Sequence, residues 1–299
     1  MSSWAEVLDE LSTRKTVDDI RREKLRNLQD YSGRNVIAYY SGFLTNKSSD
    51  VSINDSDMNG FMNAVYGLDR TKGLDLILHT PGGTVSATGA IVSYLRGVFG
   101  TNIRCMVPQI AMSAGTMTAC ACKEIVMGKH SSIGPIDPQF GGISCGEILE
   151  EFEKAYKEIT TKPASIPVWQ VMISKYAPAF VGQCQKAVDF SREMVQEWLE
   201  SGMFANDPQT AKTKATKVIK ALGDHGIMKQ HDRHISAEEA KRIGLTVFNL
   251  EDDQTLQDLL LTVHHSFMLT FSGAEDIVKI IENHLGNAMV LRSRIYRPS

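Results

Sequence analysis

The chain alternates short apolar runs with segments of helical periodicity between residues 35 and 128, and this alternation constrains its fold more than any other feature. Each apolar run is rich in strand-forming residues and has the length of one buried strand. The runs are NVIAYYSGFL (35–44), LDLILHT (74–80), IRCMVP (103–108) and EIVMG (124–128), and the helical segments between them include 57–68 and 85–100. Strands separated by single helices favour right-handed crossovers, so we expect an α/β fold with a parallel sheet.

From about residue 146 the pattern becomes mostly helical. Helices are expected over 146–159, 168–176, 178–201 and 212–223, then a helix capped by Ser236 and a short strand within 234–251, then two closing helices over 253–271 and 274–286. The sequence shows no internal repeat and no flexible linker. The predicted organisation is an N-terminal helix (1–30), one α/β domain (31–251) and a helical C-terminal extension (252–299).

Two turns at predicted strand ends carry residues suited to chemistry. One is HTPGG, which ends in Gly82 and Gly83, and the other lies in AMSAGTMTACA (111–121), which contains Ser113. Thirty residues separate Gly83 from Ser113, the length of one crossover, so both turns should open onto the same sheet edge, where α/β folds bind ligands. The paired glycines allow a ligand close to the backbone, and the amides of Gly83 and Ala114 could converge on one oxygen. Two such donors beside a serine hydroxyl make an acyl-transfer site with an oxyanion hole.

Each turn also has a simpler interpretation. A serine at the start of a helix often does no more than cap it, and a PGG after a strand is often only a turn. The combination of the two turns strengthens the catalytic interpretation, and the motifs alone leave both interpretations open.

Longer motifs add a family resemblance to this reasoning. LILHTPGGTVSATGAIVSYL, followed by VPQIAMSAGTMTACACKEIVMGKHSSIGPIDPQF, resembles the serine dehydrogenase proteinase family, and the later segments DRHISAEEAKRIGLTVFNLE and KIIENHLG resemble further parts of it. That family belongs to the Clp-protease/crotonase superfamily and is related to the signal peptide peptidases. The resemblance implies a Clp-protease/crotonase-like fold, with a parallel sheet in a ββα-type superhelix.

The resemblance also implies roles for individual residues. Ser113 matches the nucleophile, and Gly83 and Ala114 match the oxyanion donors, with Gly82 beside them. Ser132, in SSIG (131–134), matches a serine that helps to orient the base in signal peptide peptidases.

The general base is left with several candidates. The relatives with a serine–lysine pair imply Lys186 in the long helix, while Lys175 and His130 are alternatives, and a neighbouring subunit could supply the base. A lysine must lose its proton to act as a base, so it needs burial or a cationic neighbour.

The predicted function is therefore a serine endopeptidase of the signal-peptide-peptidase-like, serine–lysine type, acting on a peptide or protein. The main alternative is a catalytically inactive Clp-fold scaffold or binding protein. A crotonase-like acyl-CoA enzyme would need carboxylates at the pocket rather than a serine. The resemblance also implies a homo-oligomer. No nicotinamide-binding G-x-G-x-x-G follows a strand and no P-loop is present, so no cofactor is expected.

Composition excludes several other classes. The net charge of −3 implies no broad basic surface, so no nucleic-acid partner is expected. No run reaches 18 apolar residues and the N-terminus is charged from residue 6, so neither a membrane span nor a signal peptide is expected. The five cysteines include no second C-x-C pair, and His231 and His234 have no third ligand at useful spacing, so no metal is expected. Reduced core cysteines suggest a cytoplasmic protein.

Overall fold

The computed structural model describes residues 7–10, 16–46, 48–223 and 233–293. Its centre is a seven-stranded sheet with the strand order β10-β5-β3-β2-β1-β11-β12. The strands are β1 (Asn35–Ser41), β2 (Leu74–His79), β3 (Ile103–Val107), β5 (Glu124–Met127), β10 (Val247–Asn249), β11 (Ile277–Asn283) and β12 (Ala288–Arg292). The five strands from β10 to β1 pair in parallel, which confirms the expected mixed α/β fold.

The C-terminal strands correct one expectation. The predicted closing helix over 274–286 is wrong, because β11 pairs antiparallel with β1 and then turns into β12. Of the predicted helical C-terminal extension, α12 (Gln254–Gly273) is helical as expected. Strand β11 is buried along its whole length, because it lies between β1 and β12. It pairs with backbone groups of β1 that would otherwise form an open sheet edge.

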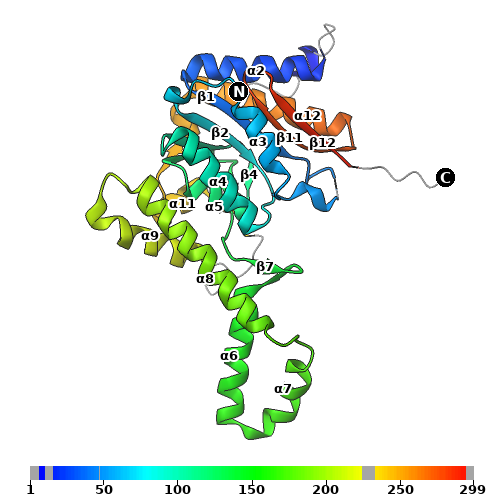
Figure 1. The fold of residues 1–299 in the computed structure, drawn as a ribbon, viewed down its shortest axis with the longest axis vertical. Helices are drawn as coiled ribbons and strands as arrows, with labels where there is room; N and C mark the ends of the chain where they lie inside the picture. The colour runs from blue at the N-terminus through cyan, green and yellow to red at the C-terminus, as the bar shows by residue number, and fades with distance from the viewer. Residues whose placement is uncertain (1–6, 11–15, 47, 224–232, 294–299) are drawn as a thin grey trace, which may run out of the picture.

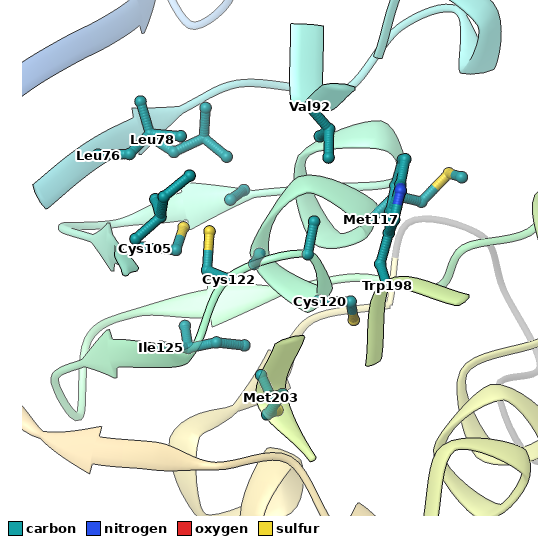
Figure 2. Close-up of a cluster of buried hydrophobic side chains, with 14 of the residues drawn as sticks. Leu76, Leu78, Val92, Cys105, Met117, Cys120, Cys122, Ile125, Trp198 and Met203 are labelled. Carbon is teal, nitrogen blue, oxygen red and sulfur yellow. The ribbon is translucent and has the colours of Figure 1, made fainter. Parts of the chain in front are cut away.

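Helices cover both faces of the sheet. They are α2 (Val17–Ser32), α3 (Asp57–Val65), α4 (Val85–Phe99), α5 (Ala114–Cys120), α9 (Pro208–Gly223) and α11 (Ala237–Ile243), besides α12. On one face, α2 and α12 pack on alternate residues of β1 such as Val36 and Tyr40. On the other, α3, α4 and α5 pack on the residues between them, such as Ile37 and Tyr39. Figure 2 shows part of this second cluster, with Met117 of α5 and Trp198, the last residue of α8 (Phe180–Trp198), among its members.

The predicted N-terminal helix is confirmed in its second half. Helix α2 begins after Thr16, whose hydroxyl accepts a hydrogen bond from the Asp19 amide while the Asp19 carboxylate reaches back to the Thr16 amide. This reciprocal capping box fixes the start of the helix. Residues 7–10 are also helical, and 1–6 and 11–15 lie outside the described residues.

A helical hairpin projects from this body, as Figure 1 shows, and we call residues 145–190 the arm. It consists of α6 (Cys145–Thr161), a 3-10 turn (Pro163–Ser165), α7 (Ile166–Ile173) and the first half of α8 (Phe180–Trp198). Its small core contains Cys145, Ile148, Cys184 and Val188. Val168 and Val171 of α7 are exposed.

Short elements complete the described structure. They are the strands β4 (Ile110–Ala111), β6 (Ser132–Ile133) and β9 (Ile235–Ser236) of a small sheet, the hairpin β7 (Gln139–Phe140) and β8 (Ile143–Ser144), the 3-10 turns Ser49–Val51, Arg70–Lys72 and Leu250–Asp252, and the π-turn Leu199–Met203. All five cysteines are buried and free. None of the helices in the described residues combines the length and the apolar character needed to cross a bilayer.

Candidate active site

The two conspicuous turns meet at one edge of the sheet, as the sequence predicts. Thr80, at the end of β2, forms a parallel bridge with Ala111 of β4. Its amide donates to the Ile110 carbonyl at 3.0 Å, and its own carbonyl accepts from the Met112 amide at 3.0 Å. The PGG turn and the MSAG turn are therefore joined by backbone hydrogen bonds immediately before each begins.

Ser113 adopts a backbone conformation that residues with a side chain rarely take. Its φ is 50° and its ψ is −114°, outside the regions favoured by residues other than glycine. Such a conformation costs about 1–3 kcal/mol and persists only where its surroundings impose it. Here the Gly115 amide donates to the Met112 carbonyl at 2.8 Å, and the Met117 amide donates to the Ser113 carbonyl at 3.0 Å.

The Ser113 hydroxyl does not cap helix α5. Although Ser113 occupies the N-cap position, its side chain accepts no capping hydrogen bond. The side chain is half-buried and borders a cavity instead. The helix-cap interpretation of this serine is therefore wrong.

Gly82 allows the two turns to touch. Its φ is 104°, and a Cβ placed on it would lie 2.8 Å from Ser113 Cβ and 3.2 Å from the Ala114 nitrogen. Its amide donates to Thr80 Oγ1 at 3.1 Å, and its carbonyl accepts from the Ile53 amide at 2.8 Å. Any larger residue at this position would separate the PGG turn from Ser113.

Gly83 lies against the backbone of Ile53 with no room for a side chain. A Cβ on Gly83 would lie 2.2 Å from the Ile53 carbonyl oxygen, and the Thr84 amide donates to that oxygen at 3.0 Å. Within the described residues, neither the Gly83 amide nor the Ala114 amide donates a hydrogen bond to a protein group. Of these two amides, that of Gly83 belongs to a residue that lines the cavity with Ser113, whereas Ala114 is buried.

A cavity of about 850 Å³ opens beside these turns. It is lined by the loop after β1, the turn 81–86, Ser113 and Met117, the stretch 136–142 and α8 of the arm. Its walls are largely apolar, with the aromatic rings of Phe140 and Phe190 on the arm side. Among the described residues, Asp50 is the one titratable side chain in its lining.

The three candidate bases lie outside this lining. Lys186 is exposed on α8, but its neighbour Ala187 and Phe190, one helical turn further on, both line the cavity. Lys175 is exposed beyond the end of α7, and His130 is exposed in the turn after β5. The structure thus brings Ser113, Gly82 and Gly83 together. Lys186 lies outside the cavity lining, next to the lining residue Ala187.

Ser132 is placed next to a histidine rather than in the cavity lining. It is buried, and its hydroxyl lies 2.6 Å from His234 Nδ1, while its amide donates to the Gln109 carbonyl at 2.7 Å. The pairing of β4 with β6 holds it opposite Ile110, beside the serine turn. His231 lies outside the described residues.

A buried histidine, His79, ends strand β2 just before the PGG turn. His79 Nε2 lies 3.1 Å from Gln109 Oε1, and its Nδ1 lies 3.3 Å from the Ser41 carbonyl. Burial lowers the pKa of His79 to about 4, so the ring is neutral at pH 7. A neutral imidazole at the end of β2 keeps this part of the sheet uncharged.

Sequence reasoning missed the loop after β1 as part of the site. Ser52, Ile53 and Asn54 line the cavity, and Ile53 pairs with Gly83. The sequence contained a signal for this loop, because it follows the carboxyl end of a parallel strand, as the PGG and MSAG turns do.

The fold and the site together define a class of protein. A model of the ClpP-like SDH-type serine proteinase family matches residues 12–261, and the chain belongs to this family. The match confirms the expected family and the expected Clp-like fold.

Particular relatives are more distant. The chain is 30% identical over 197 residues to the uncharacterized protein MJ0137 of Methanocaldococcus jannaschii, an alignment that covers 66% of this chain and 60% of that protein. It is 27% identical over 197 residues to MJ1495 of the same organism, with 66% and 59% covered. The chain therefore spans about 60% of the length of these relatives.

Two solved structures of the 1510-N membrane-bound stomatin-specific protease, one with a substrate peptide, are similar at a TM-score of 0.40 and 18% identity. The similarity covers 69% of this chain and 78% and 74% of those chains.

Proposed function

We propose that this protein is a serine endopeptidase in which Ser113 is the nucleophile. The observation that carries the proposal is the state of Ser113: it is held at positive φ, caps no helix and borders a cavity between two unused backbone donors. A strained turn that exposes a hydroxyl beside an oxyanion hole is the arrangement that acyl transfer needs. Family membership supports the same chemistry.

The reaction follows from these groups. Ser113 Oγ forms a bond to the peptide carbonyl carbon as its proton passes to the base, and the carbonyl oxygen becomes an oxyanion held by the Gly83 and Ala114 amides. The base then gives its proton to the leaving amine as the C–N bond breaks. Water hydrolyses the resulting ester by the same two steps. Loss of one oxyanion donor typically lowers kcat by about 10²- to 10³-fold.

We propose Lys186 as the base, which makes the site a serine–lysine pair of the signal-peptide-peptidase-like type. Its support is its place on α8, one residue before Ala187 and one helical turn before Phe190, both of which line the cavity. A flexible four-carbon stem allows an ammonium on this flank to turn towards the cavity.

Chemical labelling tests both assignments. A fluorophosphonate probe should modify wild-type protein, and Ser113→Ala should abolish the modification. Lys186→Met should lower the labelling rate by about 100-fold, within the range for general-base catalysis. Lys175→Met and His130→Gln are the controls because both side chains, like that of Lys186, are exposed, and their labelling should remain at the wild-type rate. A reversed ranking would move the base to Lys175 or His130.

One observation favours the inactive scaffold as a second candidate. Within the described residues, no lysine or histidine lines the cavity beside Ser113. If wild-type protein remains unlabelled at every pH between 6 and 10 while it is folded, the scaffold or binding function replaces the peptidase.

The expected setting of the enzyme is part of the same proposal. We expect a peptide or protein substrate, a homo-oligomer and a cytoplasmic location. Size-exclusion chromatography with light scattering measures the oligomeric state, and a monomer at micromolar concentration would contradict the expected homo-oligomer.

A further inference from the structure

A buried ion pair links the C-terminal strand β11 to the loop after β1. Lys279 of β11 and Asp57 of α3 are both fully buried, and Lys279 Nζ lies 2.5 Å from Asp57 Oδ1. The same ammonium donates to the Ser52 carbonyl at 2.9 Å. Lys279 therefore reaches across the sheet edge to fix the backbone of the loop at Ser52.

The partner carboxylate fixes the same loop at a second point. Asp57 Oδ2 accepts from the Asn54 amide at 3.1 Å and from the Tyr39 hydroxyl at 2.9 Å. The loop is thus held at Ser52 and at Asn54, the residues immediately before and after Ile53. Its position depends on side chains from β1, α3 and β11 together.

Ile53 is the residue that holds the PGG turn. Its amide donates to Gly82 and its carbonyl accepts from Thr84, so the Gly83 amide lies between two backbone hydrogen bonds to one residue. The backbone of Ile53 also occupies the space where a Gly83 side chain would be. A shift of Ile53 by a few tenths of an ångström would therefore move the Gly83 amide with it.

We propose that Lys279, paired with Asp57, is a positioning residue for the oxyanion donor Gly83. The proposal rests on the proposed peptidase function. Lys279 lies in β11, beyond residues 12–261, which the family model matches. A buried ion pair gains little net stability because desolvating both charges opposes their attraction. Its clearest effect here is geometric: it fixes the loop on both sides of Ile53.

The proposal predicts a defect in the chemical step rather than in substrate binding. The contact between the Gly83 amide and the substrate oxygen strengthens as the oxyanion forms, so misplacing the amide lowers kcat with little change in KM. A residue that only stabilised the fold would not lower kcat while leaving KM almost unchanged.

The test compares two double variants, each of which removes one buried ion pair between β11 and a helix. Lys279→Met with Asp57→Asn removes the pair without leaving one buried charge alone. The control is Arg21→Met with Glu282→Gln, because Arg21 and Glu282 are a fully buried ion pair on the opposite face of β11. For both we measure the fluorophosphonate labelling rate at Ser113, kcat and KM on a peptide, the melting temperature, and hydrogen exchange of the Ile53 and Thr84 amides.

The expected result is a difference between the two variants. The Lys279/Asp57 variant should label about 10- to 100-fold more slowly, with KM within about twofold of wild type, as expected for loss of a transition-state contact. Its Ile53 and Thr84 amides should exchange faster. The Arg21/Glu282 variant should lose melting temperature but retain the labelling rate and the protection of these two amides.

Each other outcome overturns a specific statement. A folded Lys279/Asp57 variant with wild-type labelling and exchange overturns the positioning role, and so does an equal loss of labelling in both variants. If wild-type protein is not labelled, the proposed function fails, and amide exchange alone decides whether the pair positions Gly83. If the double variant does not fold, Tyr39→Phe, which removes a hydroxyl that contacts both Asp57 and Thr80, replaces it; an unchanged labelling rate then overturns the proposal.

Discussion

The body and the arm contribute to the same cavity, but they are held together in different ways. The body surrounds its sheet with two extensive apolar clusters, and buried ion pairs link strand β11 to helices α3 and α2. The arm has a small core of four buried residues and leaves aromatic and aliphatic side chains exposed, among them Tyr156, Val168 and Phe190. The body supplies Ser113 and the PGG turn, and the arm supplies a wall with Ala187 and Phe190 as well as the proposed base Lys186.

This contrast suits the two tasks of a peptidase site. Oxyanion stabilisation requires donors that are already in place, because dipoles that reorganise during the reaction stabilise the transition state less. Admission of a polypeptide benefits from a wall that can move, and elements with few buried apolar contacts open most readily. The following predictions test this division, from the largest expected effect to the smallest.

The body should not tolerate a methyl group at Gly83. Gly83→Ala would place Cβ 2.2 Å from the Ile53 carbonyl oxygen, so the loop or the turn must move. We expect a loss of about 4 kcal/mol in the free energy of unfolding, at the upper end for single substitutions, and loss of fluorophosphonate labelling. Chemical denaturation measures the first and mass spectrometry the second. Gly97→Ala in α4, where nothing lies within 4 Å of the added carbon, is the control. Equal stability of the two variants would show that the site edge is not rigid.

The body should also lose stability as the pH falls below neutral. Burial lowers the pKa of His79 from 6.5 to about 4, so the unfolded chain binds more protons than the folded one between these values. The contribution of His79 is fully present above pH 6.5 and is lost as the pH falls towards 4, by about 3 kcal/mol in total.

Urea denaturation between pH 7 and 4 measures this slope. His79→Gln should flatten it, and the remaining slope should reflect other groups such as His264, whose pKa burial also lowers. The same slope in the variant and in wild type would mean that His79 is hydrated in the folded protein.

The arm wall should affect substrate binding and leave the chemistry unchanged. Phe190→Ala removes an aromatic ring from the cavity, so KM for an apolar peptide should rise about tenfold, equivalent to about 1.4 kcal/mol. The value of kcat and the labelling rate of a small fluorophosphonate should be unchanged, because Ser113 and its donors belong to the body. Steady-state kinetics separate the two parameters. Tyr156→Ala, an exposed arm aromatic outside the cavity lining, should behave like wild type; a fall in kcat for Phe190→Ala alone would show that this ring takes part in the chemistry beside the proposed base Lys186.

The smallest effect is expected where the arm is open to solvent. A Cβ on Gly182 in α8 would meet nothing within 4 Å, and glycine costs a helix about 0.5–1 kcal/mol relative to alanine. Gly182→Ala should therefore slow hydrogen exchange in the first turns of α8 by a few-fold. Exchange mass spectrometry resolves this segment, with Gly97→Ala affecting only α4. Faster exchange in α8 would indicate that the arm uses the freedom of this glycine.

The sequence by itself determined the parallel part of the sheet and the meeting of the two turns. Local patterns were sufficient there, because each apolar run forms one buried strand and a single right-handed crossover brings Gly83 and Ser113 to the same edge. Whether Ser113 caps a helix or borders a cavity could not be decided without its backbone angles. These angles depend on hydrogen bonds to β2 and within the turn.

The tertiary structure alone decided the C-terminal strand and the contacts that hold the PGG turn. The charges in IVKIIENH suggest the polar face of a helix, yet Lys279 and Glu282 are fully buried on opposite faces of β11. Their partners, Asp57 and Arg21, lie more than 200 residues away in the sequence. From the sequence pattern alone each charged residue is predicted to face solvent. Only the folded chain brings up the opposite charge that allows such a residue to be buried.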